Sequence, residues 1–251
     1  MRRTQKTCLR RPARFALAVY HVHPCPRSLA LRTKVFYPPT LQQRGDFKKL
    51  IGMLDSPYVR RTAISLKLLG LPFEHAAVSV FRHFDQFSAI NPVVKAPTLV
   101  CDDGTVLIDS TLIIDYAETL AGRSLMPAAI AERQHALRVI GLALAACEKA
   151  VQIVYEHNLR PSEKVHGPWV ERVHSQLLAA VEALEAEWKD APLPVEENEL
   201  TQAGVTVAVA WAFIQLMVAD RVPAADYPRL VAYSVAAEQL GAFRELPMDA
   251  V

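Results

Sequence analysis

The sequence predicts a small α/β layer domain followed by an all-helical domain, in a chain of 251 residues. Three observations indicate this order. Residues 46–124 alternate short β-rich runs with stretches of helical spacing, which is typical of helices layered on a sheet. An Asp-Gly turn at 103–104 joins two of these runs as a hairpin. After Pro127 no strand pattern competes, and residues 128–251 have helical spacing with breaks that contain proline or glycine.

The first domain has the predicted order strand, helix, strand, connection, hairpin, helix. Lys48–Leu54 is a short apolar run typical of a strand. Pro57–Leu69 has helical spacing and ends at Gly70, where a C-terminal glycine belongs. Phe73–Val80 alternates well enough for a second strand. The remaining predicted elements are an irregular or weakly helical Phe81–Asn91, hairpin strands over Thr98–Cys101 and Thr105–Ile108, and a helix over Thr111–Leu120.

The second domain consists of predicted helices alone. One of them requires a membrane test, because Thr201–Ala219 contains no charge and its length would suffice for a span. Its polar residues are Thr201, Gln202, Thr206 and Gln215. A helix buried on all sides has the same composition, so we expect a buried helix and no membrane span. The other predicted helices are Ala128–Asn158, Trp169–Lys189 and Tyr227–Leu240.

Charge is unevenly distributed along the chain. The formal net charge of +2 argues against nucleic acid as the main ligand. Residues 1–45 nevertheless contain ten basic residues and no acidic one, so the remainder is net acidic. This basic arm has the composition of a mitochondrial presequence. The alternatives are a disordered arm, or an upstream over-extension of a start that lies downstream.

The cysteines predict neither a disulfide framework nor a metal site. The four of them form no Cys-x-x-Cys pair, which favours a reducing, cytoplasmic compartment. His21, His23 and Cys25 cluster in the basic arm, but no second ligand pair follows at zinc-site spacing. We therefore expect no metal.

Two polar corners precede the helices of the first domain. Ser56 and Pro57 fit the N-cap and the first position of one helix, and a serine cap contributes about 1 kcal/mol. Ser110, directly after Asp109, would cap the other helix. If the preceding strands are neighbours, both helix N-termini open toward one cleft and can bind an anion. The Asp109 carboxylate suits an ammonium instead, so the corners together predict a small ligand with both signs of charge.

The order and spacing of these pieces resemble the glutathione S-transferase family over residues 48–246. The similarity is to the bacterial type, with a serine at the sulfur-activating position. The resemblance implies a thioredoxin-like N-terminal domain, an all-helical C-terminal domain and a homodimer. The motifs that carry it are SPYVRR at 56–61, NPVVKAPTLV at 91–100, DS at 109–110 followed by TLIIDYAE, and the ending DYPRLVAYSVAAEQLGAFRELP.

The same resemblance implies a role for five residues. Ser56 would donate a hydrogen bond to the glutathione sulfur. A cis bond would precede Pro97, with the backbone groups of Ala96 pairing with the cysteinyl part of glutathione. Asp109 would bind the γ-glutamyl ammonium, and Ser110 would bind the γ-glutamyl carboxylate.

The implied activity is attack by the thiolate of bound glutathione, the co-substrate, on a small hydrophobic electrophile. A free thiol has a pKa near about 8.5, and a hydroxyl donor at a helix N-terminus favours the thiolate. Two alternatives remain open. One is a non-catalytic binding or regulatory protein on the same fold. The other is a glutathione-dependent isomerase, which would return glutathione unchanged.

Two positions bear on how well this family pattern fits. Asp55 precedes Ser56, and a carboxylate facing the sulfur would oppose thiolate formation, whereas one pointing to solvent would matter little. Thr201 is followed by Gly204, where the family often has an aspartate that completes a reciprocal cap. The sequence therefore predicts a weaker start of the buried helix.

Four further side chains have two interpretations each. Arg60 and Arg61 either form a solvated or interdomain ion pair, or else contribute to binding the glycyl carboxylate or to the electrostatic potential of the cleft. Tyr155 and Trp169 lie on predicted helices, where they either line the second-substrate pocket or belong to the core.

Overall fold

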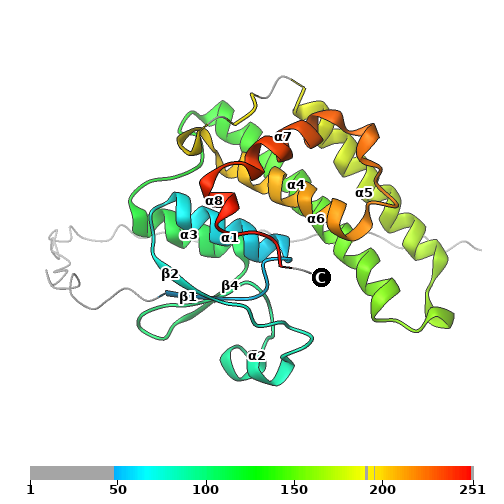
Figure 1. Cartoon of the computed structure of the whole chain (residues 1–251), viewed down its shortest axis with the longest axis horizontal. Coiled ribbons are helices and arrows are strands. Elements are labelled where there is room, and N and C mark those ends of the chain that lie inside the picture. The colour runs from blue at the N-terminus through cyan, green and yellow to red at the C-terminus, as the bar shows by residue number, and fades with distance from the viewer. Residues whose placement is uncertain (1–47, 190–191, 195, 250–251) are drawn as a thin grey trace, which may run out of the picture. The chain divides into compact units, whose positions relative to one another are not determined.

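A computed structural model describes residues 48–189, 192–194 and 196–249 of the chain. The basic arm 1–45, with its cluster of His21, His23 and Cys25, lies outside the described residues. All the helices and strands below belong to one unit, Gly45–Val251 (Figure 1).

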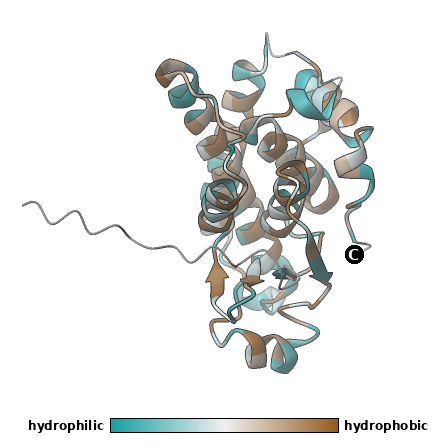
Figure 2. Cartoon of the chain, turned by 90° about the vertical axis from the view of Figure 1, so that its left-hand side faces the viewer, coloured by the Kyte–Doolittle hydropathy of each residue, from teal (hydrophilic) through white to brown (hydrophobic). Residues whose placement is uncertain are grey.

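The N-terminal part is built on a four-stranded mixed sheet with the order β2-β1-β3-β4. The central strand β1 runs parallel to β2 and antiparallel to β3, and β3 pairs antiparallel with β4 across the predicted Asp-Gly turn. The two edge strands differ in hydropathy, because β4 is Val-Leu-Ile whereas β2 carries Glu74 and His75 (Figure 2). The strands are β1 (Lys48–Ile51), β2 (Phe73–Ala76), β3 (Thr98–Val100) and β4 (Val106–Ile108).

Every strand is shorter than the sequence predicts, and local backbone geometry explains the first two. At the end of β1, Gly52 has a φ of 138° and donates its N–H to the Ala76 carbonyl at 3.1 Å. At the end of β2, the N–H of Val78 turns back to that same carbonyl at 2.9 Å. Glycine tolerates such a φ and so allows the chain to leave the sheet directly before the site.

Helices cover both faces of this sheet (Figure 1). On one face α1 (Pro57–Leu68) and α3 (Ser110–Ala121) bury an apolar cluster that includes Leu50, Leu99 and Ile113. On the other face α2 (Phe84–Ile90), a definite helix where the sequence indicated weak helicity, packs its Phe87 on Ile51. This sheet with helices on both faces is a thioredoxin-like domain.

The C-terminal part is entirely helical in the described residues. Its helices are α4 (Ile130–Asn158), α5 (Gly167–Glu187), α6 (Gln202–Val218), α7 (Pro228–Glu238) and α8 (Gly241–Arg244), with short 3-10 turns at Ser162–Lys164, Glu197–Glu199 and Ala224–Asp226. The final predicted helix, Tyr227–Leu240, is α7, which ends two residues earlier at Glu238, and α8 follows it as a separate short helix.

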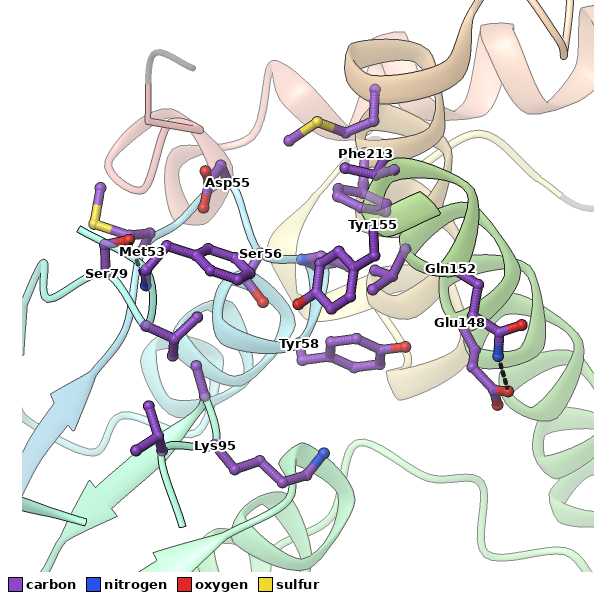
Figure 3. Close-up of a pocket in the computed structure, with 18 of the residues that line it drawn as sticks. Met53, Asp55, Ser56, Tyr58, Ser79, Lys95, Glu148, Gln152, Tyr155 and Phe213 are labelled. Carbon is purple, nitrogen blue, oxygen red and sulfur yellow. Dashed lines mark hydrogen bonds between the residues drawn. The ribbon is translucent and has the colours of Figure 1, made fainter. Parts of the chain in front are cut away.

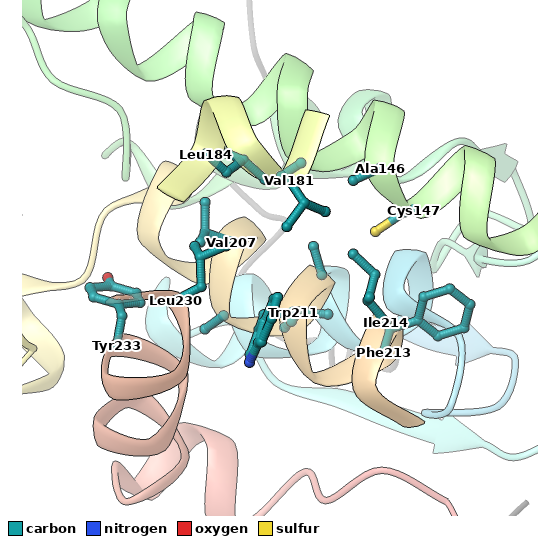
Figure 4. Close-up of a cluster of buried hydrophobic side chains, with 14 of the residues drawn as sticks. Ala146, Cys147, Val181, Leu184, Val207, Trp211, Phe213, Ile214, Leu230 and Tyr233 are labelled. Atoms are coloured by element: carbon teal, nitrogen blue, oxygen red, sulfur yellow. The ribbon is translucent and has the colours of Figure 1, made fainter. Parts of the chain in front are cut away.

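The uncharged segment forms α6, which packs between α4, α7 and α1. Val207 faces Val181 and Leu184 of α5, and Ile214 lies near Cys147 of α4 (Figure 4). Trp211 packs edge-on against Tyr227, with ring centroids 5.7 Å apart. The prediction of a buried helix is confirmed for most of α6, while Leu216 near its C-terminal end is 41% exposed. Within the described ranges, no helix is both long and apolar enough to cross a membrane.

Helix α1 joins the sheet to the helical part, and one ion pair orients it. Ile64 belongs to the core of the helical part, while Leu66 belongs to the core against the sheet. The Arg60 guanidinium donates two hydrogen bonds to the Glu238 carboxylate, at 2.6 and 2.7 Å, and one to the Leu246 carbonyl at 2.9 Å. Arg60 is therefore the predicted interdomain ion pair, and it is buried rather than solvated.

Packing explains why position 204 is a glycine and not the aspartate that the family often has there. The Thr201 hydroxyl accepts a hydrogen bond from the Gly204 N–H at 3.1 Å, so half of the expected cap is present. A Cβ at Gly204 would overlap the hydroxyl of Tyr233, which packs edge-on against Trp188 with ring centroids 4.7 Å apart. The aromatic ring of α7 thus occupies the space that a capping aspartate would need.

Candidate active site

The site begins at Ser56, where the chain passes from β1 into α1. Ser56 is the N-cap residue and Pro57 follows at the first helical position, as predicted. The serine carbonyl accepts the first helical hydrogen bond, from the Arg60 N–H at 2.9 Å. Its hydroxyl makes no capping hydrogen bond within the described residues. The simple capping role of this side chain is therefore not observed, and the hydroxyl is available to a ligand.

Ser56 lines a cavity of about 520 Å³ between the sheet domain and helices α4 and α6 (Figure 3). Apolar and aromatic side chains make up most of its wall. Tyr155 of α4 packs edge-on against Phe81, with ring centroids 5.5 Å apart, and its hydroxyl points toward the Ser56 corner in Figure 3. Tyr155 thus belongs to the pocket, whereas Trp169 of α5 does not line it. Other lining residues are Met53, Val78, Val80, Val151, Val154, Phe213 and Met217.

A second cavity of about 520 Å³ adjoins the first. It lies between the β3 and α3 corners and the α4 residues Gly141, Leu144 and Ala145. The four residues predicted to bind a ligand there, Ala96, Pro97, Asp109 and Ser110, all line it. The Ala96–Pro97 peptide bond is cis. The two cavities are contiguous, since Tyr58, Lys95, Ala96 and Glu148 line both.

The corner before α3 differs from the prediction in one respect. The cap of this helix is Asp109, whose carboxylate accepts a hydrogen bond from the Thr111 N–H at 2.9 Å. Ser110 is instead the first helical residue, and its hydroxyl accepts a hydrogen bond from Arg61 at 2.9 Å. The prediction that Ser110 caps the helix is wrong, because Asp109 already occupies the capping position.

Strained backbone is concentrated in these walls. Among the described residues, the non-glycine residues with positive φ are Val94, at 51°, and Asp109, at 71°. Val94 lines the first cavity and Asp109 lines the second. Such conformations cost on the order of 1–3 kcal/mol each and cluster at functional sites.

Burial alters the titration of groups around the first cavity. It raises the pKa of Asp55, and the neighbouring Asp249 carboxylate raises it further. Asp55 lines the cavity, so it is not simply directed to solvent, and its raised pKa reduces the negative charge it carries at mildly acidic pH. Burial likewise raises the pKa of Tyr58 and Tyr155. Both phenols therefore remain protonated at neutral pH and can donate hydrogen bonds.

Three residues at the junction of the cavities were not among the predicted site residues. Tyr58 and Lys95 lie inside the two motifs that carried the resemblance, but no spacing rule distinguishes them. Glu148 comes from the middle of α4, where it accepts a hydrogen bond from Gln152 at 2.9 Å (Figure 3). Only the packing of α4 over the sheet domain reveals it. No group of three or more His, Cys, Asp and Glu side chains suited to a metal occurs in the described part of the chain.

The fold and site together define a class of two-domain proteins, with a thioredoxin-like N-terminal domain and an all-helical C-terminal domain. A glutathione S-transferase structure from Methylobacterium radiotolerans, in complex with glutathione sulfonate, matches with a TM-score of 0.73 and 20% identity. That match covers 82% of this chain and 97% of the other. Maleyl pyruvate isomerase, a bacterial zeta-class protein, matches with a TM-score of 0.61 and 25% identity, over 79% of this chain and 95% of the other.

Sequence comparison leads to the family. A family model described as the glutathione S-transferase N-terminal domain matches residues 50–125. The uncharacterized GST-like protein YibF of Escherichia coli is 24% identical over 164 residues, which are 65% of this chain and 81% of YibF. Matches to plant glutathione S-transferases span between 32% and 57% of those proteins. The N-terminal part of the chain thus matches the glutathione S-transferase N-terminal domain, and the chain is similar to glutathione S-transferases and a GST-like protein.

Proposed function

We propose that this protein is a glutathione transferase whose Ser56 stabilises the thiolate of bound glutathione. The observation that carries the proposal is the Ser56 hydroxyl, which begins a helix without capping it and lines a cavity. A free hydroxyl beside the N-terminus of α1 can donate to a negative sulfur, and the helix dipole adds to the effect.

Glutathione would bind across the contiguous cavities. Its γ-glutamyl end would occupy the second cavity, with the ammonium on Asp109 and the carboxylate on Ser110 and the free N–H groups at the start of α3. The cysteinyl part would lie beside Ala96, which lines both cavities and brings the sulfur toward Ser56.

The reaction then needs no covalent bond to the protein. The thiol loses its proton to solvent, and the sulfur lone pair forms a C–S bond with the electrophilic carbon. The electron pair of the bond that breaks leaves with the departing group, and the products are a thioether and an anion. Each unit by which the site lowers the thiol pKa corresponds to about 1.4 kcal/mol of preference for the thiolate.

The wall of the first cavity favours a neutral, hydrophobic electrophile. Phe81, Tyr155 and Phe213 provide aromatic surface, and Tyr155 also offers a hydroxyl donor. Asp55 and Glu148 contribute two carboxylates against the single ammonium of Lys95. This charge balance disfavours acidic electrophiles, and with them an isomerase that acts on an acid.

We also propose that the protein is a homodimer. Helix α3 exposes Leu112, Tyr116 and Leu120 at four-residue spacing, so they share one face of the helix. Leu112 is 65% exposed, and Val93, in the loop between α2 and β3, is 66% exposed. An apolar stripe of this kind is typical of an interface. Sedimentation equilibrium tests it, and a monomer at micromolar concentration would contradict it.

The central test replaces Ser56 by alanine. Glutathione binding is measured by calorimetry, thiolate formation by its ultraviolet absorbance, and turnover with an aromatic electrophile that carries a halide leaving group. We expect Ser56→Ala to raise the pKa of bound thiol by about one unit or more, because a hydrogen bond to a charged group contributes about 1.5–3 kcal/mol. Ser56→Thr keeps a hydroxyl and should retain part of the effect.

Ser65→Ala is the matched control, since it removes a serine hydroxyl from the same helix. The Ser65 hydroxyl is buried, has the Arg61 carbonyl at 2.7 Å and the Gln202 side-chain oxygen at 3.0 Å as acceptors for its proton, and lines neither cavity. We expect it to lower stability while the thiol pKa stays unchanged. A wild-type protein that binds no glutathione at millimolar concentration would overturn the proposal. Binding without turnover would favour a non-catalytic binding protein, and release of unchanged glutathione with a rearranged product would favour an isomerase.

A further inference from the structure

We propose that Arg61 is a positioning residue for a carboxylate subsite at the start of α3, where it selects ligands that carry the γ-glutamyl carboxylate. The inference rests on the proposed binding of glutathione and assigns a residue behind the wall of that site. Arg61 does not line the second cavity itself, but it lies directly behind Ser110 and Thr111, which do.

The first observation is the contrast between two adjacent arginines of α1. Both are almost completely buried, with Arg60 1% exposed and Arg61 2% exposed. Arg60 is neutralised by the Glu238 carboxylate. Within the described residues, Arg61 forms no ion pair within 4.0 Å, and its Nε atom is buried without a hydrogen-bond partner. Among the described residues, one buried guanidinium thus contacts a carboxylate and the other does not.

The second observation concerns the groups that face Arg61. Its Nη1 atom donates to the Ser110 hydroxyl at 2.9 Å and to the Thr111 hydroxyl at 3.2 Å. Burial lowers the pKa of Arg61 to about 10, so the guanidinium is still charged at neutral pH. Its other neighbours are Cys147, Asp109 and Tyr58. Burial keeps the Cys147 thiol and the Tyr58 phenol neutral, which leaves Asp109 as the nearby anion.

Asp109 stabilises the charge of Arg61 from a distance, but the two side chains form no ion pair within 4.0 Å among the described residues, and the Asp109 carboxylate accepts a hydrogen bond from the Thr111 N–H. A buried charge that lacks a contacting partner is disfavoured, so a nearby anion stabilises it. The second cavity lies on the far side of Ser110 and Thr111, and an anion there would add the counter-charge that no contacting carboxylate supplies. The Thr111 N–H is taken by Asp109, and the other N–H groups at the start of α3, a helix of 12 residues, are suited to an anion at the same place.

Hydrogen-bond chemistry explains how Arg61 acts through its neighbours. A guanidinium can only donate, so the oxygens of Ser110 and Thr111 must accept from it. Each hydroxyl then has its own proton left to donate, and it can donate it to a ligand carboxylate. Without Arg61 these hydroxyls are free to rotate and to accept instead. Arg61 therefore contributes both a positive potential and the direction of two donors.

The test is a double cycle between protein and ligand. The ligands are glutathione and 4-aminobutanoyl-cysteinylglycine, which lacks only the γ-glutamyl carboxylate and keeps the ammonium and the thiol. Dissociation constants are measured by calorimetry for the full-length wild type, Arg61→Gln and Arg60→Gln. Arg60→Gln is the matched control, because it removes an equally buried arginine from the same helix but one that faces Glu238.

We expect the wild type to bind glutathione about 10-fold or more tightly than the analogue, as hydrogen bonds to a charged group imply. Arg61→Gln should weaken glutathione about 10-fold and the analogue less than about 2-fold, so that the preference disappears. Arg60→Gln should lower the melting temperature and keep the preference. If Arg61→Gln does not fold, Arg61→Lys retains the charge and should weaken glutathione alone by a smaller factor.

Two outcomes would overturn the inference while leaving glutathione binding intact. One is a wild type without preference for the carboxylate, and the other is an equal loss for both ligands in Arg61→Gln, which indicates a purely structural role. A wild type that binds neither ligand is a different result. It would overturn the proposed function, and the carboxylate subsite with it, before any variant is measured.

Discussion

The buried ion pair between Arg60 and Glu238 yields the sharpest prediction about stability. Replacing Glu238 by glutamine keeps the shape of the side chain but leaves the guanidinium without its counter-charge. Removing one partner of a fully buried pair costs about 3–5 kcal/mol. The Glu238 side chain is 32% exposed, so solvent screens part of the interaction and we expect a loss of about 2 kcal/mol.

Two other contacts of Arg60 limit how much stability a second substitution, at Arg60 itself, can restore, because that substitution removes them. The Arg60 Nε–H still donates to the Leu246 carbonyl, and the guanidinium still lies 5.5 Å from the centroid of the Phe243 ring. Replacing both partners, as Arg60→Met with Glu238→Gln, removes the unpaired charge. The double variant should therefore be no less stable than Glu238→Gln alone.

The assay is urea unfolding followed by circular dichroism, with the free energy of unfolding extrapolated to water. Glu245→Gln is the matched control, because it breaks the ion pair of Lys67, on the same helix, with a carboxylate that is 65% exposed. We expect that control to change stability by less than about 0.5 kcal/mol. Equal effects of Glu238→Gln and Glu245→Gln would refute the reasoning that burial gives the first pair its weight.

Two further predictions concern packing and titration. Gly204→Ala should destabilise the protein by about 1–3 kcal/mol, since its Cβ would overlap the Tyr233 hydroxyl. The control is Gly141→Ala on α4, whose Cβ meets nothing within 4 Å, so this variant should be neutral or stabilising. The urea midpoints of the two variants are compared, and equal effects would contradict the packing argument. Asp55→Asn should raise the melting temperature at pH 7, because burial raises the pKa of Asp55 and so its charged form disfavours folding. That gain should vanish as the pH falls below the unfolded pKa of about 4, where the carboxyl is protonated in both states; a gain that is the same at pH 3.5 and pH 7 would exclude this cause.

The sequence by itself determined the class of fold and most of the elements that carry the site. Local signals suffice for these, because a hairpin turn, a helix cap and the spacing of apolar residues depend on near neighbours along the chain. Ser56 with Pro57 and Asp109 with Ser110 were recognisable as corners at helix starts. The absence of charge in residues 201–219 was enough to predict a buried helix, because polarity and burial are directly linked.

Only the tertiary structure decided what the side chains at these positions do. In the described part of the chain, the hydroxyl of Ser56 makes no capping hydrogen bond, Asp109 rather than Ser110 caps α3, and the two adjacent arginines have different partners. Adjacent residues on a helix point about 100° apart, so Arg60 meets α7 while Arg61 meets α3, and nothing local in the sequence identifies either partner. Likewise, Gly204 is required by a ring that lies 29 positions along the chain, at Tyr233, because contacts between distant segments arise only when the helices pack.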